Sequence, residues 1–286
     1  MNIEATTKVY GIFGHPVSHS LSPKMHNAAF GALGIDSLYI AFDVDPKDLE
    51  IAARAIKPIG IQGVNITIPH KENIIFFLDE ISAEASLTGA VNTVKNEDGK
   101  LKGYNTDVGG FLKALKGDLE FSPNGMRATV LGAGGAARAV VTALCMSEAS
   151  GIYVVNRTFD KAKKLASEFK KGFKDISIEA VSLDDKRGVK DSLNTADILI
   201  NSTSAGMKGI DQIEIPLEHL SEGAVVYDLV YSPRETELVR MAKEMGRKAS
   251  GGLSMLVYQG AESFEIWTGM KAPIEMMRKA IEGLSS

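Results

Sequence analysis

The feature that most constrains this chain is a glycine turn between an apolar segment and an alanine-rich one. Residues 128–131 read ATVL and run into Gly132, and the residues that follow read AGGAARAVV. The pattern predicts strand, tight turn and helix, and Gly132, Gly134 and Ala137 have the spacing G-x-G-x-x-A. Such glycines let backbone N–H groups approach a pyrophosphate at a helix N-terminus. Glycine turns also join strands to helices where nothing binds, so the turn alone leaves both interpretations open.

The residues at the end of the next predicted strand help to decide whether the glycine turn binds a cofactor. Residues 152–155 read IYVV and are followed by Asn156, Arg157 and Thr158, with Lys161 one turn later. An acidic residue here would bind the ribose 2′-hydroxyl of NAD, whereas an arginine suits the 2′-phosphate of NADP. The sequence therefore predicts NADP; the alternative is a solvated arginine beside a helix cap.

Length and composition limit the remaining classes of protein. A chain of 286 residues predicts two domains, and 44% hydrophobic with 24% charged residues is ordinary for a globular protein. The net charge of -4 gives no reason to expect nucleic acid or anionic membrane as a partner. Cys145 is the single cysteine, so an intrachain disulfide is excluded. The first nine residues lack the apolar core of a signal peptide, and we expect a cytoplasmic location.

The N-terminal part predicts alternating strands and helices. Residues 9–14 form a buried strand in this interpretation, and a helix with Ser22 as its N-cap ends at Gly34. Ser18 and Ser20 lie on the loop between them, where their hydroxyls either bind a ligand or only shape the turn.

Two further candidates follow a later strand. Residues 38–42 and 63–68 read as strands, so Thr67 and Lys71 stand at the carboxyl end of the second. Ligands bind at that end of an open α/β sheet. A lysine taken alone is more often solvated.

A hairpin makes the first sheet mixed. Residues 90–95 and 101–104 flank the sequence NEDG, which predicts two antiparallel strands and a turn. Asp107 then opens a helix, where it is either a helix N-terminal residue or a functional group.

From residue 127 to 250 strands and helices alternate in the pattern of a doubly wound sheet. The predicted strands are 129–131, 152–155, 176–181, 197–201, 224–228 and 247–249. Two helices follow Gly251 and Gly252 without another strand, so we place them back against the N-terminal part.

The predicted fold class is therefore α/β with two domains and a cleft between them. The substrate domain has a mixed, mostly parallel sheet and comprises residues 1–107 with the helices of 253–286. The cofactor domain is a Rossmann-type doubly wound sheet over residues 108–252. Hinges are expected near 107–110 and 251–252.

A hydride-carrying cofactor needs a partner that moves a proton, and Lys71 with Asp107 is the pair available. His15, His19 and His26 lie near one loop, but no carboxylate or cysteine completes a local zinc site, so no metal is expected. The nucleophile elbow G-x-S-x-G is absent.

Several separated motifs resemble those of the shikimate dehydrogenase family, and the resemblance covers essentially the whole chain. Besides the glycine turn they are VSHSLSP at 17–23, NITIPHK at 65–71, GAVNT at 89–93, GYNTD at 103–107, NRT at 156–158, NSTSAGM at 201–207, YDLVY at 227–231 and GGLSMLVYQG at 251–260.

The resemblance implies reversible, NADPH-dependent reduction of 3-dehydroshikimate to shikimate in aromatic amino acid biosynthesis, with Lys71 and Asp107 as the catalytic pair. It implies substrate contacts by Ser18, Ser20, Thr67, Asn92, Tyr231 and Gln259. It implies NADP contacts by Gly132, Ala133, Gly134, Gly135, Ala136, Asn156, Arg157, Thr158, Lys161, Thr203, Leu229, Gly252 and Met255.

Three rivals stay open at this point. A quinate/shikimate dehydrogenase that uses NAD is disfavoured by Arg157 and by the pair Ser18 and Ser20. A non-catalytic NADP-binding regulator on this fold would be expected to lack Lys71 or Asp107. A methylenetetrahydrofolate dehydrogenase would not need the serine pair. A monomer or a homodimer is expected, and the sequence does not say which of Lys71 and Asp107 donates the proton.

Overall fold

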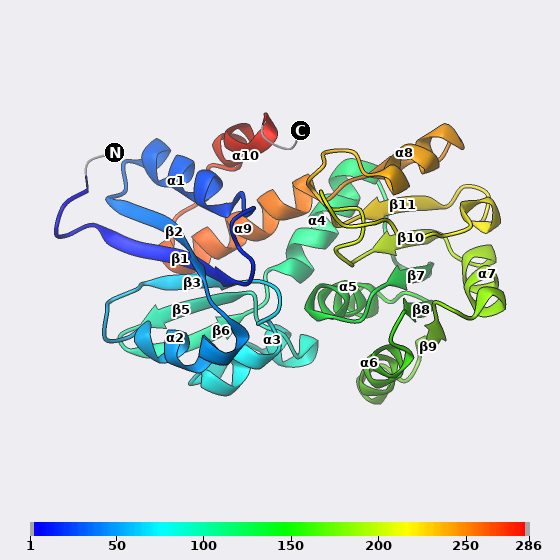
Figure 1. The fold of residues 1–286 in the computed structure, drawn as a ribbon, viewed down its shortest axis with the longest axis horizontal. Helices are drawn as coiled ribbons and strands as arrows, with labels where there is room; N and C mark the ends of the chain where they lie inside the picture. The colour runs from blue at the N-terminus through cyan, green and yellow to red at the C-terminus, as the bar shows by residue number, and fades with distance from the viewer. Residues whose placement is uncertain (1–2, 284–286) are drawn as a thin grey trace. The chain divides into compact units, whose positions relative to one another are not determined.

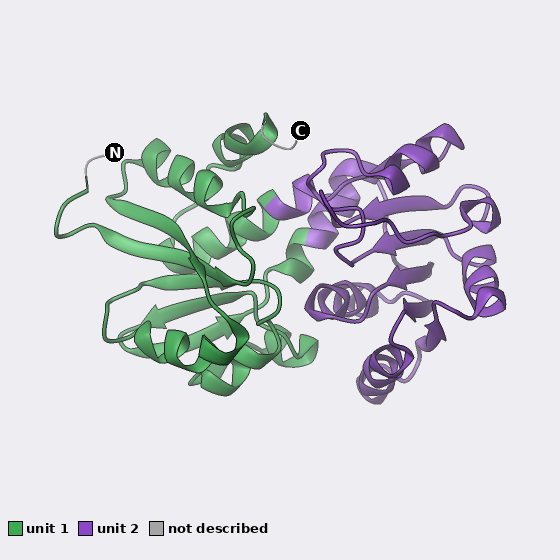
Figure 2. Cartoon of the chain, in the orientation of Figure 1, with its two compact units in different colours: residues 1–110, 257–284 green, residues 111–256, 285–286 purple. Residues whose placement is uncertain are grey.

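The computed structural model describes residues 3–283, which divide into two compact units (Figures 1 and 2). The first unit comprises the described residues up to Gly110 and from Val257 onward, and the second runs from Phe111 to Leu256. Helices α4 (Asp107–Leu119) and α9 (Leu253–Thr268) each contribute residues to both units. The units therefore divide about one helical turn beyond each boundary that the sequence predicted.

The first unit holds a six-stranded mixed sheet in the order β2-β1-β3-β5-β6-β4. Its strands are β1 (Lys8–Gly14), β2 (Ser37–Asp43), β3 (Gly63–Ile66), β4 (Glu80–Ile81), β5 (Thr93–Glu97) and β6 (Lys100–Tyr104). β1 pairs in parallel with β2 and β3, whereas β5 is antiparallel to β3 and β6. The predicted hairpin is confirmed, with Asp98 and Gly99 at positive φ in its turn.

The helical segments of this unit are short apart from α1 and α9. They are α1 (Ser22–Leu33), 3-10 turns η1 (Pro46–Asp48) and η2 (Asn73–Phe77), α2 (Leu49–Ala55), α3 (Ala83–Thr88) and α10 (Ile274–Glu282). The predicted N-cap of α1 is wrong by one residue: Leu21 is the cap and Ser22 is already helical, because the Leu21 carbonyl accepts from Met25 N–H at 3.1 Å. The predicted end is confirmed, since Gly34 caps α1 in the left-handed region at φ 64°.

Alternation along the strands separates two faces of this sheet. Val64 and Ile66 pack with α2, η2 and α3 in one core cluster. Tyr10 and Tyr39 lie on the other face, where their rings contact Trp267 of α9. Asn65 lies between Val64 and Ile66 in β3, so its side chain points to the opposite face. β3 thus buries its apolar side chains against α2 and directs the polar Asn65 toward α9.

The second unit is an all-parallel sheet in the order β12-β11-β10-β7-β8-β9. Its strands are β7 (Arg127–Leu131), β8 (Gly151–Asn156), β9 (Ser177–Ser182), β10 (Ile198–Asn201), β11 (Val225–Asp228) and β12 (Ala249–Ser250). Its helical segments are α5 (Gly135–Met146), α6 (Phe159–Gly172), α7 (Lys186–Asn194), η3 (Leu217–His219) and α8 (Glu237–Glu244). All six predicted strands are present, and each is displaced by at most two residues at either end.

The chain runs from β7 outward to β9 and then returns to β10 on the other side of β7. This reversal of strand order defines a switch point, at which open α/β sheets bind ligands. One face of the sheet packs against α7, η3 and α8. None of the described helices is both long and apolar enough to span a bilayer.

Candidate active site

The strand directions bring four predicted segments to one edge of the first sheet. β1 and β3 are parallel, so the loop with Ser18 and Ser20 and the residues Thr67 to Lys71 leave the sheet at the same edge. β5 runs the opposite way and pairs Thr93 with Asn65 and Tyr104, so its first residues lie at that edge too. β6 ends there, immediately before the segment that leads into α4.

Lys71 and Asp107 form an ion pair at this edge. Lys71 Nζ lies 2.6 Å from Asp107 Oδ2, and the two side chains are 14% and 7% exposed. Lys71 O also accepts from Val91 N–H at 2.8 Å, which ties the lysine to the segment that enters β5. A pair this short and this buried holds an ammonium donor and a carboxylate acceptor in a fixed relation, as proton transfer to a bound oxygen requires.

Asn92 connects this pair to α9. Its Nδ2 lies 2.9 Å from Asp107 Oδ1 and 3.3 Å from Gln259 Oε1. Helix α9 approaches closely because residue 110 is glycine: a Cβ there would lie 2.8 Å from Gln259 Cβ. The structure thus brings together Lys71, Asp107, Asn92 and Gln259, which are far apart in the sequence.

The remaining predicted substrate residues differ in their surroundings. Ser18 is exposed and Ser20 is half-buried, with Ser20 Oγ accepting from Ser22 N–H at 3.3 Å. Thr67 is half-buried at the end of β3. Tyr231 lies in the second unit, and burial raises the pKa of its phenol, so it is a neutral hydrogen-bonding group at ordinary pH.

Sequence reasoning missed a second layer of polar residues behind the pair. His70 is buried and its Nε2 lies 2.7 Å from the Val44 carbonyl, which anchors the loop that carries Lys71. Asn65, Thr106 and Ser263 are buried beneath Asn92. Asn65 and Thr106 stand inside recognised motifs, but no local signal points to Ser263, because its partners come from other segments of the chain.

The glycine turn is tightly packed at its first glycine and open at the next one. Gly132 has φ 109°, and a Cβ there would meet Ser202 Oγ at 2.8 Å. Gly134 is the N-cap of α5 and offers no capping side chain, and a Cβ added to it would meet nothing within 4 Å. The turn therefore leaves open space above the first N–H groups of a helix, where an anion can bind.

The end of β8 supplies positive charge near this turn, since β7 and β8 are parallel neighbours. Arg157, Thr158 and Lys161 are exposed, and neither cation forms an ion pair with another described residue. Asn156 fixes the local backbone by donating from Nδ2 to the Thr158 carbonyl at 2.9 Å. Two cations without an ion-pair partner, and no carboxylate among residues 156–158 at the strand end, suit a 2′-phosphate.

Three other predicted cofactor residues follow β10, β11 and β12. Thr203 Oγ1 donates to Asn201 Oδ1 at 2.7 Å, and Gly252 N–H donates to the Val230 carbonyl at 2.9 Å. A Cβ on Gly252 would collide with the Leu229 carbonyl, so only glycine fits beside that residue.

Asp228 organises this region of the second unit. The fully buried carboxylate accepts from Asn201 Nδ2 at 2.9 Å, Val230 N–H at 3.0 Å and Thr236 Oγ1 at 2.6 Å. Burial raises its pKa to about 6, although the three hydrogen bonds act in the opposite direction. The carboxylate thereby holds the end of β10 and the loop after β11 in a fixed relative position.

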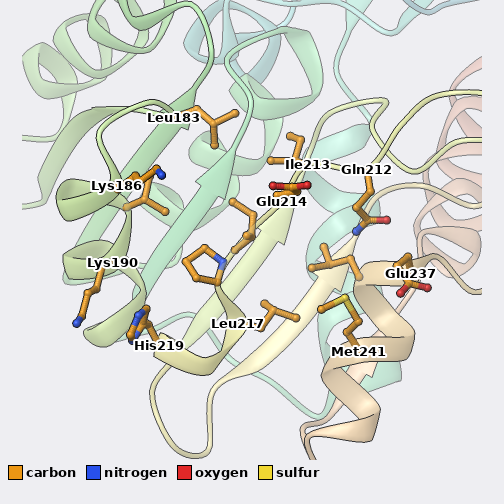
Figure 3. A pocket seen from close by; sticks show the side chains of 14 residues that line it. Leu183, Lys186, Lys190, Gln212, Ile213, Glu214, Leu217, His219, Glu237 and Met241 are labelled. Carbon is orange, nitrogen blue, oxygen red and sulfur yellow. The ribbon is translucent and has the colours of Figure 1, made fainter.

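An apolar pocket lies elsewhere in the second unit. This cavity of about 680 Å³ lies between α7, the segment before η3, and α8. Figure 3 shows the side chains that line it. No predicted site residue lines it. Among residues 3–283 no three histidine, cysteine, aspartate or glutamate side chains gather as metal ligands would.

Models of known protein families match three successive parts of this chain. Residues 12–94 match the shikimate dehydrogenase substrate binding domain, residues 116–245 match shikimate / quinate 5-dehydrogenase, and residues 252–282 match the shikimate 5′-dehydrogenase C-terminal domain.

Individual relatives match over nearly their whole length. The shikimate dehydrogenase (NADP(+)) of Methanopyrus kandleri is 46% identical over 98% of this chain and 97% of its own. A shikimate dehydrogenase solved in complex with NADP+ superposes with a TM-score of 0.89 at 43% identity, covering 100% of this chain and 98% of that one. The Thermus thermophilus shikimate 5-dehydrogenase, solved with NADP(H) and shikimate, has a TM-score of 0.85 at 38% identity, covering 96% and 99%. This chain belongs to the shikimate dehydrogenase family.

Proposed function

We propose that this protein catalyses the reversible reduction of 3-dehydroshikimate to shikimate with NADPH, and that Lys71 and Asp107 are its catalytic pair. Family membership makes the chain an NADP-dependent oxidoreductase of the shikimate pathway. The observation that carries the residue assignment is the 2.6 Å contact between Lys71 Nζ and Asp107 Oδ2 at the sheet edge where Asn92 and Gln259 also lie.

When bound, NADPH would supply a hydride to the ring carbonyl carbon. The oxygen of that carbonyl gains negative charge, and Lys71 stabilises it and transfers a proton from Nζ. Asp107 orients the ammonium through Oδ2 and exchanges the proton with it. The two groups therefore act as one unit in delivering the proton to the substrate oxygen.

The polar groups around the pair would bind the ring hydroxyls. Asn92 and Gln259 offer amide groups from two different elements, and Thr67 offers a hydroxyl at the end of β3. Ser18 and Ser20 would bind the carboxylate, with Tyr231 as a further donor. A buried amide left without a partner costs about 1 to 3 kcal/mol, so such a site discriminates against analogues that lack a hydroxyl.

In the second unit, Gly132 to Ala136 would hold the pyrophosphate on the N-terminus of α5. Arg157, Thr158 and Lys161 would bind the 2′-phosphate, and Asn156 would support their loop. Thr203, Leu229, Gly252 and Met255 would line the rest of the cofactor. Arg157 is the reason to favour NADP over the NAD-dependent quinate/shikimate alternative.

The first test follows absorbance at 340 nm after the protein is mixed with shikimate or quinate and with NADP or NAD. A rise with shikimate and NADP well above the other three combinations supports the proposal. Equal rates with NAD or quinate would move the assignment to the broader-specificity enzyme. No rise from protein that binds NADPH would favour the non-catalytic regulator.

The catalytic role of Lys71 is tested by Lys71→Ala. Loss of the proton donor should lower kcat by about 10² to 10⁴ with a milder effect on KM for shikimate. Lys57→Ala is the matched control, because Lys57 pairs with Asp79 at 2.9 Å in the same unit but is 39% exposed and away from the sheet edge. Retained turnover in Lys71→Ala would contradict the assignment.

The cofactor assignment is tested by Arg157→Ala. Loss of a charge-assisted contact to the 2′-phosphate should raise KM for NADP about tenfold and leave KM for shikimate nearly unchanged. Arg187→Ala, which removes a 93% exposed arginine of α7, is the control. Equal losses for both substrates would argue against contact with the 2′-phosphate.

A monomer or homodimer in the cytoplasm, as expected from the sequence, stays a prediction.

A further inference from the structure

A cluster of buried polar side chains lies directly behind Asn92 and Asp107. Tyr39, Thr93, Thr106 and Ser263 are 0% exposed, and Asn65 is 4% exposed. Polar groups at such positions give little net stability compared with apolar residues of the same shape, even when they are fully hydrogen-bonded. What a satisfied network does supply is a single geometry.

The donors and acceptors fix how Asn92 faces Asp107. The Thr106 backbone N–H can only donate, and it lies 2.8 Å from Asn92 Oδ1. The amide nitrogen of Asn92 must therefore point the other way, and it donates to Asp107 Oδ1 at 2.9 Å. Asn92 thus holds the carboxylate oxygen that Lys71 does not contact.

Asn65 is fixed by the same reasoning. The Asn92 carbonyl can only accept, and Asn65 Nδ2 donates to it at 3.1 Å. Asn65 Oδ1 then accepts from the Tyr39 hydroxyl at 2.7 Å. Thr106 consequently holds the side chain of Asn92, and Asn65 holds its backbone.

Ser263 joins these two supports. Its Oγ lies 3.0 Å from Asn65 Nδ2, 2.7 Å from Thr93 Oγ1 and 3.2 Å from Thr106 Oγ1. It also donates to the Gln259 carbonyl at 3.0 Å, one turn earlier on α9. One hydroxyl therefore links β3, β5 and the start of α4 to the helix that carries Gln259.

We propose that Ser263 is a positioning residue for the reaction, acting through Thr93 and Thr106 on Asn92 and so on Asp107. The inference rests on the proposed function of Asp107. Ser263 is fully buried and acts on the reacting atoms only through other residues. Without its hydroxyl, Thr93 and Thr106 lose one shared partner, and the two threonine hydroxyls that contact Asn92 Oδ1 hold that amide less tightly. The Asp107 carboxylate then samples positions in which Lys71 is misaligned.

The test is the single-turnover rate of hydride transfer, because slow product release can hide a change in the chemical step. Ser263→Ala should lower this rate by about 10- to 100-fold, the effect of a small misplacement of a catalytic group, with a smaller effect on KM for shikimate. Thr268→Ala is the matched control on the same helix: Thr268 Oγ1 donates to the carbonyl one turn earlier, of Phe264, at 2.8 Å, as Ser263 does to Gln259. The control should leave the rate at its wild-type value.

A double variant separates positioning from a loss of structure. If Ser263 acts through Asp107, Ser263→Ala should cause no further loss in the Asp107→Asn background. Losses that multiply, or a wild-type rate in Ser263→Ala, would overturn the proposal. If Ser263→Ala does not fold, Thr93→Val removes the next hydroxyl of the network, whose Oγ1 lies 3.0 Å from Asn92 Oδ1, and should show the same fall in rate. A wild-type protein inactive on shikimate would instead refute the proposed function.

Discussion

Asp228→Asn should change how the stability of the second unit depends on pH. Burial raises the pKa of this carboxyl from the ordinary 3.8 to about 6. Each tenfold difference in proton affinity is about 1.4 kcal/mol, so the difference corresponds to about 3 kcal/mol. Because the folded state binds the proton more tightly, this contribution is fully present below pH 3.8 and is lost as pH rises through about 6.

The side chain in the Asp228→Asn variant cannot ionise, so the variant does not lose this stability as the pH rises. It will carry a constant cost, since the Thr236 hydroxyl loses its acceptor, but that cost is the same at every pH. The free energy of unfolding of the variant minus that of the wild type should therefore increase by about 2.4 kcal/mol between pH 4 and pH 7, because the unfolded carboxyl is already partly ionised at pH 4.

The assay is urea unfolding at several pH values, followed by circular dichroism. The single tryptophan, Trp267, lies in the first unit, so its fluorescence reports on that unit and circular dichroism is needed to follow the second. A difference between the two proteins that stays constant from pH 4 to pH 7 would refute the reasoning.

Two glycine substitutions make further predictions. Gly134→Ala adds a Cβ that meets no protein atom within 4 Å, so thermal stability should be kept or slightly raised. The Kd for NADP should rise about tenfold or more, because the methyl group occupies the pyrophosphate space. Unchanged affinity in a binding titration would contradict this placement of the pyrophosphate. Gly63→Ala should cost about 1 to 3 kcal/mol of unfolding free energy, because its Cβ would collide with the Trp267 indole. That indole is held in place by donating from Nε1 to the Val94 carbonyl at 3.0 Å. An unaltered Trp267 emission and an unaltered denaturation midpoint would argue against the contact between residue 63 and Trp267.

The sequence predicted most of the elements because their signals are local. The hairpin followed from a glycine-containing turn between two β-rich segments, and the end of α1 followed from Gly34. The N-cap of α1 was wrong by one position because Leu21 already has helical backbone angles, which no property of its side chain indicates. Boundaries depend on single hydrogen bonds, whereas the existence of an element depends on many residues.

For the candidate site, too, the sequence could predict what is local and not what depends on distant segments. Lys71, Asp107 and the glycine turn lie in short motifs, so the sequence could identify them as candidates. The contact between Lys71 and Asp107 spans 36 positions, and the contact between Asn65 and Ser263 spans 198. No periodicity or propensity encodes either contact.

By itself, then, the sequence determined the fold class, the family and the residue types available for chemistry, because these follow from local patterning and from motifs that are read in order. The tertiary structure decided which of those residues meet. Antiparallel pairing of β5 with β3 and β6 brought Asn92 and Asp107 to the edge where Lys71 lies, and the close approach of α9 at Gly110 added Gln259 and Ser263. The physical reason is that strand direction and helix packing are settled by burial over the whole unit, and only then do polar groups distant in the chain come within hydrogen-bonding range.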